Sequence, residues 1–312
     1  MAKSDNPTFA IMGSGGMGGY IGAKLSHAGY QVSFVARGAH LATMKKNGLK
    51  IEEPEAAFVI DPIRATSDPK EIGPVDFVLF CVKLWDTESA GEQCRDLVGP
   101  NTAVLSMQNG VDAEPTLNNI LGPEHVMGAT SEIGANIIEP GFVRRFTPFA
   151  IIRFGEFDQI RSKRSIQFSE AITAAGLGAE HVDSISLTIW EKFLWLVGAS
   201  ALNCVTRQPF GPVREDPDTR ALLIQIMKEV MSVANAKGIP LTNENIETRL
   251  DYIDSLPGQA KVSMALDLER GNQLELPWLS GTVIRMGKEL SIPTPVNCVI
   301  YAALKHYIMG ST

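Results

Sequence analysis

The sequence predicts an α/β protein whose N-terminal half is a doubly wound sheet and whose C-terminal half is an all-helical domain. In the first half, short apolar runs alternate with helix-like segments, which is typical of βαβ units around a parallel sheet. From about Ser186 the segments carry helical periodicity instead, and Gly and Pro mark the joints between them. A chain of 312 residues can form two cores, so we expect one domain at 1–184 and another at 185–312.

Each predicted element follows from a local pattern. Strands are expected where apolar runs end at turn residues, and helices where apolar residues recur every three to four positions. Residues 137–154 contain Gly and Pro among β-branched residues, which favours antiparallel strands. The other expected strands are 8–12, 31–35, 77–82, 103–106, 125–129 and 180–184, and the expected helices are 20–28, 166–175, 189–203, 219–237, 243–256, 260–270, 278–290 and 296–308.

A glycine-rich turn follows the first expected strand. Its sequence is Gly13-Ser14-Gly15-Gly16-Met17-Gly18, which fits the G-x-G-x-x-G pattern between a strand and a helix. Gly13 would permit the tight turn, Gly15 would let the backbone approach a pyrophosphate, and Gly18 would let the helix pack against the strand. The free N–H groups of the helix start would then face the phosphates, so the sequence predicts a Rossmann-type dinucleotide site rather than a loop that binds nothing.

The end of the second expected strand indicates whether the dinucleotide is NAD or NADP. A domain that prefers NAD usually has a carboxylate here, but this chain has none between Gln31 and Lys50 and offers Arg37 instead. A guanidinium binds a phosphate dianion through paired, charge-assisted hydrogen bonds. We therefore expect NADP(H) as the cofactor, with a solvated surface arginine as the alternative.

Composition excludes several other classes of protein. The chain is 45% hydrophobic and 20% charged with a net charge of −7, which describes an ordinary soluble protein and argues against general nucleic-acid binding. No signal-peptide core and no run of about 18 apolar residues is apparent, so we expect a cytoplasmic protein without a membrane span. Without C-x-x-C spacing we expect reduced, buried thiols and no metal site from the four cysteines, Cys81, Cys94, Cys204 and Cys298.

Two polar residues follow expected strands in the first half. Lys83 comes after the third strand and Asn109 after the fourth, at the carboxyl ends where ligands of doubly wound sheets bind. Either side chain could touch the nicotinamide ribose or an anionic substrate. For Asn109 the alternative is purely structural, because Asn-Gly is a turn dipeptide.

Four polar residues of the helical half are further candidates. Lys192 is expected to open a strongly apolar helix, where a partly desolvated ammonium could donate a proton; a lysine that snorkels at the surface is the alternative. Ser263 and Asp267 lie four residues apart, on one face of an expected helix, and Glu275 follows. These three could line one wall of a pocket or could be scattered, solvated groups.

Taken together, these motifs make the chain resemble the ketopantoate reductase family, NADP-dependent 2-dehydropantoate 2-reductases, from the glycine turn to the last helix. The matching segments occur in family order, and together they are far more specific than any one alone. They are the glycine turn, Arg37, Cys81-Val82-Lys83, Gln108-Asn109-Gly110, Trp190-Glu191-Lys192, Ser263-Met264, Asp267, Glu275, Gly281 and Pro293.

The resemblance implies a role for each candidate. The glycine turn and Arg37 would hold NADPH, with Lys83 and Asn109 at the nicotinamide end and Asn109 also near the substrate. Lys192 would be the general acid, and Glu275 would orient the substrate oxygen or the Lys192 ammonium. Ser263 would bind the substrate carboxylate, and Asp267 would support the same wall.

One part of the chain departs from the family pattern. Asparagines are expected four and eight residues after the lysine, where this chain has Leu196 and Ser200. Ser200, or Asn203 one turn further on, could supply a displaced polar contact to the substrate. The loss of an amide favours a different or bulkier substrate.

The sequence thus predicts an NADPH-dependent reductase of a 2-oxo acid, with the active site between two domains. Ketopantoate, reduced to pantoate in pantothenate biosynthesis, is the first expectation. Another 2-oxo or hydroxy acid, or a non-catalytic NADP-sensing role, is the alternative. The apolar helical half also suggests a homodimer, which a sedimentation run can check.

Overall fold

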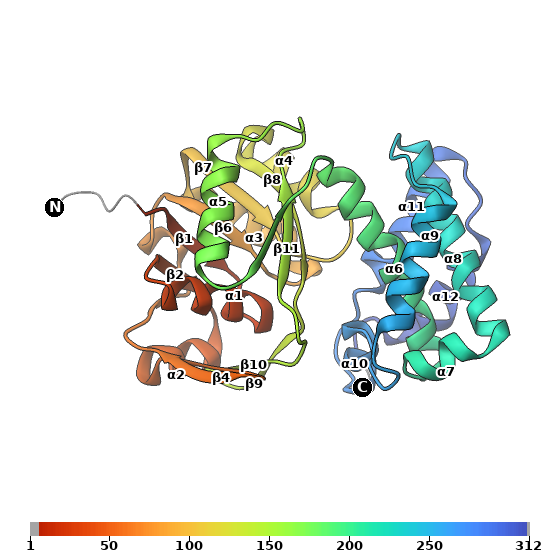
Figure 1. Cartoon of the computed structure of the whole chain (residues 1–312), viewed down its shortest axis with the longest axis horizontal. Coiled ribbons are helices and arrows are strands. Elements are labelled where there is room, and N and C mark those ends of the chain that lie inside the picture. The colour runs from red at the N-terminus through yellow and green to blue at the C-terminus, as the bar shows by residue number, and fades with distance from the viewer. Residues whose placement is uncertain (1–5, 311–312) are drawn as a thin grey trace. The chain divides into compact units, whose positions relative to one another are not determined.

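The computed structural model describes residues 6–310, which form two compact units (Figure 1). The first unit contains the chain up to Asn109 and then Ala113–Ile185. The second contains the chain from Ser186 onward and also takes in the short segment Gly110–Asp112.

An eight-stranded sheet forms the centre of the first unit. Six neighbouring strands run parallel, whereas β11 is antiparallel to β8 and carries β12 beside it. The predicted doubly wound sheet is therefore confirmed, with a reversed pair of strands at one edge. The strand order is β12 (Gly178–His181), β11 (Ile151–Gly155), β8 (Val126–Glu132), β7 (Val98–Ser106), β6 (Val75–Phe80), β1 (Thr8–Met12), β2 (Gln31–Val35) and β5 (Arg64–Thr66).

Helices cover both faces of this sheet, because alternate strand residues point to opposite sides. Phe9 and Ile11 of β1 belong to the core beneath α1 (Gly16–His27) and α5 (Lys163–Ala174). Ala10 and Met12 of the same strand belong to the opposite core. That opposite face is covered by α3 (Thr87–Cys94) and α4 (Ala113–Leu121), while α2 (Gly38–Asn47) follows β2.

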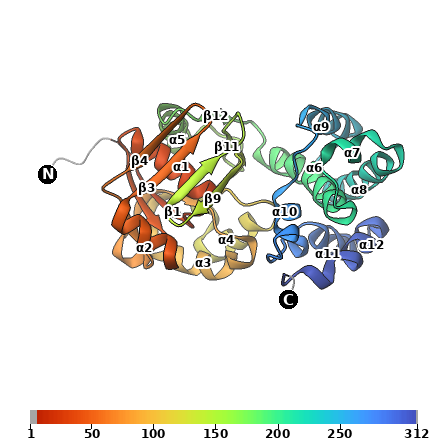
Figure 2. The same cartoon turned by 90° about the horizontal axis from the view of Figure 1, so that it is seen from below.

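A second, four-stranded sheet packs against the α1 side of the first unit (Figure 2). Leu49 and Val143 extend from it into the core that surrounds α1. The antiparallel strands expected in 137–154 are present, but the sequence analysis did not predict the strands between 49 and 66. The order of this sheet is β4 (Ala56–Ile60), β3 (Leu49–Glu53), β10 (Phe142–Arg145) and β9 (Ala135–Glu139).

The second unit is helical, as predicted, and α8 lies at its centre in contact with α7, α9, α11 and α12. Helix α6 is the one helix among the described residues that is long and apolar enough to cross a membrane, but 72% of its apolar window is buried, as in the core of a soluble domain. The helices are α6 (Ile185–Thr206), α7 (Phe210–Glu215), α8 (Pro217–Ala236), α9 (Asn243–Ser255), α10 (Ser263–Glu269), α11 (Ser280–Leu290) and α12 (Pro295–Leu304). Single 3-10 turns are η1 (Pro69–Glu71), η2 (Leu84–Asp86), η3 (Arg95–Leu97), η4 (Pro123–His125), η5 (Leu276–Trp278) and η6 (Lys305–Tyr307).

Two local expectations about this chain need correction. Gly and Pro do not always mark a joint between helices: Gly211-Pro212 lies inside α7, because Pro212 occupies the first turn, where no N–H is needed. All four cysteines are free, but only Cys94 and Cys204 are buried, since Cys81 is half-buried and Cys298 is exposed. Burial raises the pKa of Cys81 and of Cys204 to about 12, so neither is a ready thiolate.

Candidate functional site

The glycine turn follows β1, the strand at which the strand order of the large sheet reverses. Strand β1 pairs with β2 on one side and with β6 on the other. In doubly wound sheets ligands bind beyond the carboxyl ends of strands at such a switch point. Gly13 follows β1, Lys83 follows β6 and Asn109 follows β7, so all three lie at this edge.

Two glycines of the turn are required by backbone conformation and by contacts within the protein rather than by a ligand, as predicted from the sequence. Gly13 has φ +96°, a conformation that L side chains rarely adopt, and a Cβ there would lie 2.8 Å from Val82 Cγ1. A Cβ on Gly18 would collide with the carbonyl oxygen of Gly13 and lie 2.9 Å from Ile11 Cγ2. The first glycine thus makes the turn, and the last lets α1 pack against the strand.

Gly15 differs from these two, because no protein atom would touch a Cβ built on it within 4 Å. Its φ of −71° is also open to any residue. Gly15 precedes the start of α1, which has no side-chain cap and no acidic residue in its first turn. An uncapped helix start beside open space fits a pyrophosphate, whose oxygens accept hydrogen bonds from the free N–H groups.

The remaining members of the turn are held by protein contacts. The hydroxyl of Ser14 is buried and donates to the Val35 carbonyl oxygen at 3.0 Å. The Met17 sulfur accepts from Ser131 Oγ at 3.0 Å. A Cβ on Gly16 would collide with the Ala135 carbonyl oxygen of β9. In this structure Ser14 and Met17 therefore tie the turn to β2 and β8, and Gly16 allows the second sheet to approach.

We expect Gly15→Ala to fold normally and to weaken binding of a dinucleotide by about tenfold or more, because the methyl group would occupy the space that the phosphates need. Gly18→Ala should instead lower the melting temperature, since its methyl group meets backbone. Thermal unfolding together with fluorescence titration of NADPH separates the two effects. Unchanged affinity in Gly15→Ala would contradict a phosphate at this position.

Arg37 is exposed and forms an ion pair with a residue that the sequence analysis did not connect to it. Its Nη2 lies 2.8 Å from Oδ2 of Asp86, in η2. The side chain of Arg37 is 76% exposed, so it remains open to a ligand in solvent. A carboxylate is therefore present at the end of β2, although it comes from another part of the chain.

Gln108 joins two of the turns at the carboxyl edge. Its Nε2 donates to the Val82 carbonyl oxygen at 3.1 Å and to Thr87 Oγ1 at 2.9 Å. Asn109 is half-buried, and Gly110 after it has φ +93°. Lys83 is exposed, with its Nζ 5.5 Å from the centre of the Trp85 ring. Gln108 thus sets the distance between the turns of Lys83 and Asn109.

Lys192 lies within α6 and not at its start, because the helix begins earlier, at Ile185. The predicted start is too late, because polar Ser186 and Thr188 occupy the first turn of the helix and hide its apolar periodicity. Lys192 is half-buried. The preceding residue, Glu191, is bound by α9: it lies 2.7 Å from Arg249 and accepts from Asn245.

Glu275 is a buried carboxylate, 5% exposed, just before η5. Its carbonyl oxygen accepts from the N–H groups of Trp278 and Leu279 at 3.0 and 3.2 Å, which fixes the backbone at this residue. A buried carboxylate on a fixed backbone is suited to holding one orientation of a neighbouring donor.

Ser263 and Asp267 share α10, as predicted from their spacing. Ser263 is the first residue of the helix and is exposed. Asp267 accepts from Asn272 Nδ2 at 3.0 Å, and its carbonyl oxygen accepts from the Asn272 N–H at 2.8 Å. In this structure Asp267 therefore fixes the turn that ends α10.

Ser200 and Asn203, which the sequence analysis proposed as substrate contacts, are each only 1% exposed. The Ser200 hydroxyl has no partner among the described residues. Asn203 donates to the Gln208 carbonyl oxygen at 2.9 Å and accepts from the Val262 N–H at 3.2 Å. Both side chains are thus buried in this structure, and their contact with a substrate stays a prediction. Asn203 ties α6 to the start of α10, next to Ser263.

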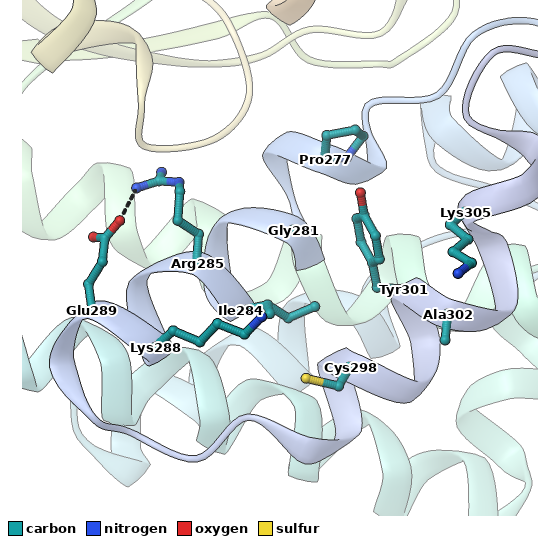
Figure 3. A pocket seen from close by; sticks show the side chains of 10 residues that line it. All are labelled: Pro277, Gly281, Ile284, Arg285, Lys288, Glu289, Cys298, Tyr301, Ala302 and Lys305. Atoms are coloured by element: carbon teal, nitrogen blue, oxygen red, sulfur yellow. Dashed lines mark hydrogen bonds and ion pairs between the residues drawn. The ribbon is translucent and has the colours of Figure 1, made fainter.

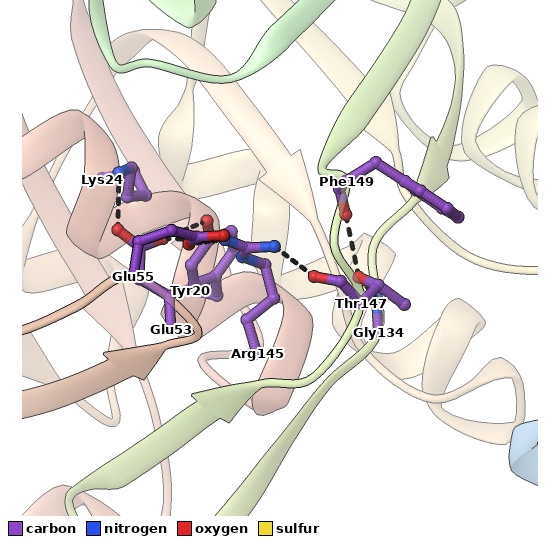
Figure 4. Close-up of polar contacts among 8 residues, drawn as sticks. All are labelled: Tyr20, Lys24, Glu53, Glu55, Gly134, Arg145, Thr147 and Phe149. Carbon is purple, nitrogen blue, oxygen red and sulfur yellow. Dashed lines mark hydrogen bonds and ion pairs between the residues drawn. The ribbon is translucent and has the colours of Figure 1, made fainter.

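Each unit has a hollow among its described residues, and neither of these two hollows is lined by the predicted catalytic residues. The hollow of the helical unit is about 660 Å³ and lies along α11 and α12, beside Arg285, Lys288 and Tyr301 (Figure 3). The hollow of the first unit is about 340 Å³. It is bordered by a network of charged side chains that includes Glu53 and Arg145 (Figure 4).

The charged network holds α1 against the second sheet. Glu53 accepts from Tyr20 Oη at 2.7 Å and from Lys24 Nζ at 3.1 Å (Figure 4). Arg145 lies 3.5 Å from Glu53 and 2.8 Å from Glu55. Because Tyr20 and Lys24 belong to α1, this network fixes the helix whose start would meet the phosphates.

Comparison with known proteins agrees with this architecture. The chain is 30% identical to 2-dehydropantoate 2-reductase of Mesorhizobium japonicum, over 95% of this chain and 96% of that protein. The crystal structure of 2-dehydropantoate 2-reductase from Geobacter metallireducens has a TM-score of 0.89 at 29% identity, covering 96% of this chain and 99% of that one. A ternary structure of D-mandelate dehydrogenase with NADH and anilino(oxo)acetate shares the fold, with a TM-score of 0.88 at 20% identity over 96% and 97% of the two chains.

Two family models cover most of the chain. The model described as ketopantoate reductase PanE/ApbA matches residues 9–159, and the model of its C-terminal part matches residues 184–308. Together with the 30% identity over nearly the whole length, these matches show that the chain belongs to the ketopantoate reductase family, oxidoreductases that use a nicotinamide cofactor.

Proposed function

We propose that the protein reduces a 2-oxo acid to the 2-hydroxy acid with NADPH, and that the substrate is 2-dehydropantoate (ketopantoate). The observation that carries the proposal is the open space at Gly15, beside the uncapped start of α1 at the switch point of the sheet. Membership in the ketopantoate reductase family supports the substrate, since relatives from several organisms bear the name 2-dehydropantoate 2-reductase.

The proposed mechanism divides the work between the two units. The nicotinamide, when bound, supplies a hydride to the carbonyl carbon of the substrate. Lys192 then gives a proton to the carbonyl oxygen, so that the C=O bond becomes CH–OH and the lysine is left neutral until it regains a proton from water. Glu275 orients the Lys192 ammonium or the substrate oxygen. Ser263 binds the substrate carboxylate, and Asp267 supports Ser263 by fixing the end of α10.

In the first unit, the proposal assigns cofactor contacts to the edge of the sheet. The backbone of the glycine turn, from Gly13 to Gly18, holds the pyrophosphate. Lys83 and Asn109 meet the nicotinamide end, at a separation set by Gln108. Arg37 holds the 2′-phosphate that distinguishes NADPH from NADH.

We expect Arg37→Gln to raise the Kd of NADPH by about 10- to 100-fold, because a charge-assisted contact to the phosphate is lost. The Kd of NADH should change less than about twofold. Fluorescence titration of both nucleotides measures this. Asp86→Asn is the control, since it releases Arg37 from its ion pair and should leave NADPH binding equal or tighter. Equal losses for both nucleotides in Arg37→Gln would reject a phosphate contact.

The activity itself is tested by following the absorbance of NADPH with ketopantoate. We expect one NADPH consumed for each pantoate formed, and no consumption without the 2-oxo acid. Absence of turnover with ketopantoate and with other branched 2-oxo acids, despite tight NADPH binding, would favour an NADP-sensing role instead.

One observation favours a second candidate, a related 2-oxo acid with a bulkier side chain. Leu196 and Ser200 stand where family asparagines are expected, and neither side chain carries an amide. The face of α6 beyond Lys192 therefore offers no amide to the substrate at these two positions. A panel of branched and aromatic 2-oxo acids, compared by kcat/KM, separates the candidates.

A further inference from the structure

The hollow along α11 and α12 has the size of a small-molecule site, and the proposed reaction does not use it. Its volume of about 660 Å³ falls within the range of about 300–1,000 Å³ that is usual for ligand pockets. Every residue that lines it lies between Pro277 and Lys305, so the helical unit forms it alone. None of the proposed catalytic or substrate-binding residues is among them, which makes the hollow a separate candidate site.

The walls of the hollow are largely apolar. Ile284 of α11 and Ala302 of α12 belong to them. The side chain of Tyr301 points toward Pro277, so its ring forms a flat part of the wall (Figure 3). A Cβ on Gly281 would lie 3.1 Å from Cε2 of this ring, and the absence of a side chain there lets the ring lie close to α11. A flat aromatic wall suits a ligand with a flat or branched apolar body.

Two lysines of the hollow carry unpaired charges. Arg285 lies 3.3 Å from Glu289, so the charges of these two side chains offset each other. Lys288 of α11 and Lys305 of η6 are exposed, and their ammonium groups make no ion pair with any residue from 6 to 310. In a protein whose net charge is −7, two such groups beside an apolar hollow create a local positive potential that attracts anions.

We propose that this hollow binds a small organic anion. The apolar body of the ligand packs against Tyr301 and Ile284, and its carboxylate, sulfonate or phosphate group lies near the ammonium groups of Lys288 and Lys305. An inorganic anion would leave the apolar walls in contact with water, and a neutral apolar compound would gain nothing from either lysine. A ligand that combines the two features uses the whole site.

Cys298 can report locally on occupancy, because it lines the hollow and is exposed. The other three cysteines are buried or half-buried, and burial raises the pKa of Cys81 to about 12, so a maleimide at neutral pH should label Cys298 first. The probe is naphthoate, a flat aromatic carboxylate. We expect it to slow the labelling of Cys298, followed by peptide mass spectrometry, by about threefold or more, with a Kd of about 0.1–1 mM.

Two controls separate charge from apolar contact. Naphthamide has the same rings without the charge, and it should protect Cys298 at least about fivefold less strongly than naphthoate. Lys288→Gln combined with Lys305→Gln should raise the Kd of naphthoate by about fivefold or more, because both charge contacts are lost. Lys228→Gln combined with Lys237→Gln is the matched control, since it removes the same charge from exposed positions of the helical unit outside the hollow. Its Kd should stay within about twofold of wild type.

A second pair of variants tests whether the hollow itself is the site. Ala302→Trp should fill the hollow and abolish the binding of naphthoate. Ala303→Trp is the matched control, because Ala303 is also exposed on α12 but does not line the hollow. It should bind naphthoate as the wild type does, and the melting temperatures of both variants show whether they fold. Equal binding by Ala302→Trp and Ala303→Trp would overturn the proposal.

Three other results would also reject the proposal. Equal losses in the two lysine pairs would show an effect of net charge rather than of the hollow. Equal protection by naphthamide would show that the lysines do not select an anion. Labelling of Cys298 that slows with rising protein concentration, without any anion, would show that a second copy of the chain covers the hollow. None of these measurements requires turnover, and saturating NADPH should leave the protection by naphthoate unchanged, so the inference stands or fails independently of the proposed reduction.

Discussion

Lys192→Ala should reduce the kcat of the 2-oxo acid reaction by about 100- to 10,000-fold, the usual contribution of a positioned general acid. The Kd of NADPH should stay within about twofold, because Lys192 lies in α6 of the helical unit and the proposed nucleotide contacts lie in the first unit. Steady-state kinetics together with fluorescence titration measure both quantities. Lys228→Ala, an exposed lysine of α8, is the matched control and should behave as wild type.

A second substitution separates the two tasks assigned to this ammonium. Lys192→Arg keeps a positive charge near the developing alkoxide, but a guanidinium does not release its proton at ordinary pH. We expect Lys192→Arg to remain nearly as slow as Lys192→Ala if proton donation dominates, and to recover much of the rate if electrostatic stabilisation dominates. Wild-type turnover in Lys192→Ala would show that another group is the acid.

Glu53→Ala should lower the free energy of unfolding of the first unit by about 3–5 kcal/mol, the usual cost of removing one partner from a buried ion pair. Glu53 and Arg145 have side chains only 10% and 7% exposed. Without the carboxylate, Arg145 and Lys24 would be left largely out of water with fewer partners. Urea unfolding followed by fluorescence measures the loss.

The stability that Glu53 contributes should depend on pH, because its carboxylate titrates. Burial alone would raise the pKa of Glu53, but hydrogen bonds from Tyr20 and Lys24, together with the positive charges of Lys24 and Arg145, outweigh it and hold the pKa below the ordinary 4.5. A carboxyl group whose pKa is lower in the folded state stabilises that state at pH values above its pKa in the unfolded chain. This stabilisation disappears as the pH falls through the pKa of the folded state. The difference between wild type and Glu53→Ala should therefore be full at neutral pH and shrink below about pH 4.

The control for this network is an exposed ion pair in the same unit. Glu92→Ala removes the partner of Arg95, and since both side chains are more than half exposed it should leave the unfolding transition unchanged. If Glu53→Ala unfolded at the same urea concentration as wild type, the network would not hold α1 in the way proposed here.

The strands of the large sheet could be predicted because their signal is local. β1 and β2 are uninterrupted apolar runs that end at turn residues, and their predicted bounds agree with the structure. In β3 charged residues interrupt the apolar pattern, whereas β4 is a short apolar run that was not recognised as a strand. β3 pairs with β10, some ninety residues away, so its structure depends on a partner that a local pattern cannot identify.

Some features of the candidate site likewise follow from a local pattern, and others depend on the folded structure. The conformations of Gly13 and Gly18 follow from the local motif and could be predicted. The ion pair of Arg37 with Asp86, by contrast, depends on where η2 lies after folding. The burial of Ser200 likewise depends on the packing of the whole helical unit, which the spacing of residues along the sequence does not reveal.

Neighbouring glycines of the turn are required for two different structural reasons. Gly15 leaves room for a ligand, whereas Gly16 leaves room for the carbonyl of Ala135 in the four-stranded sheet. Removing that sheet would release position 16 from its constraint, but it would also remove Glu53 and Arg145, which hold the helix that follows the glycine turn. The run of glycines therefore meets two requirements at once, open space at Gly15 and close approach of the second sheet at Gly16, and the second sheet supports the helix that both positions begin.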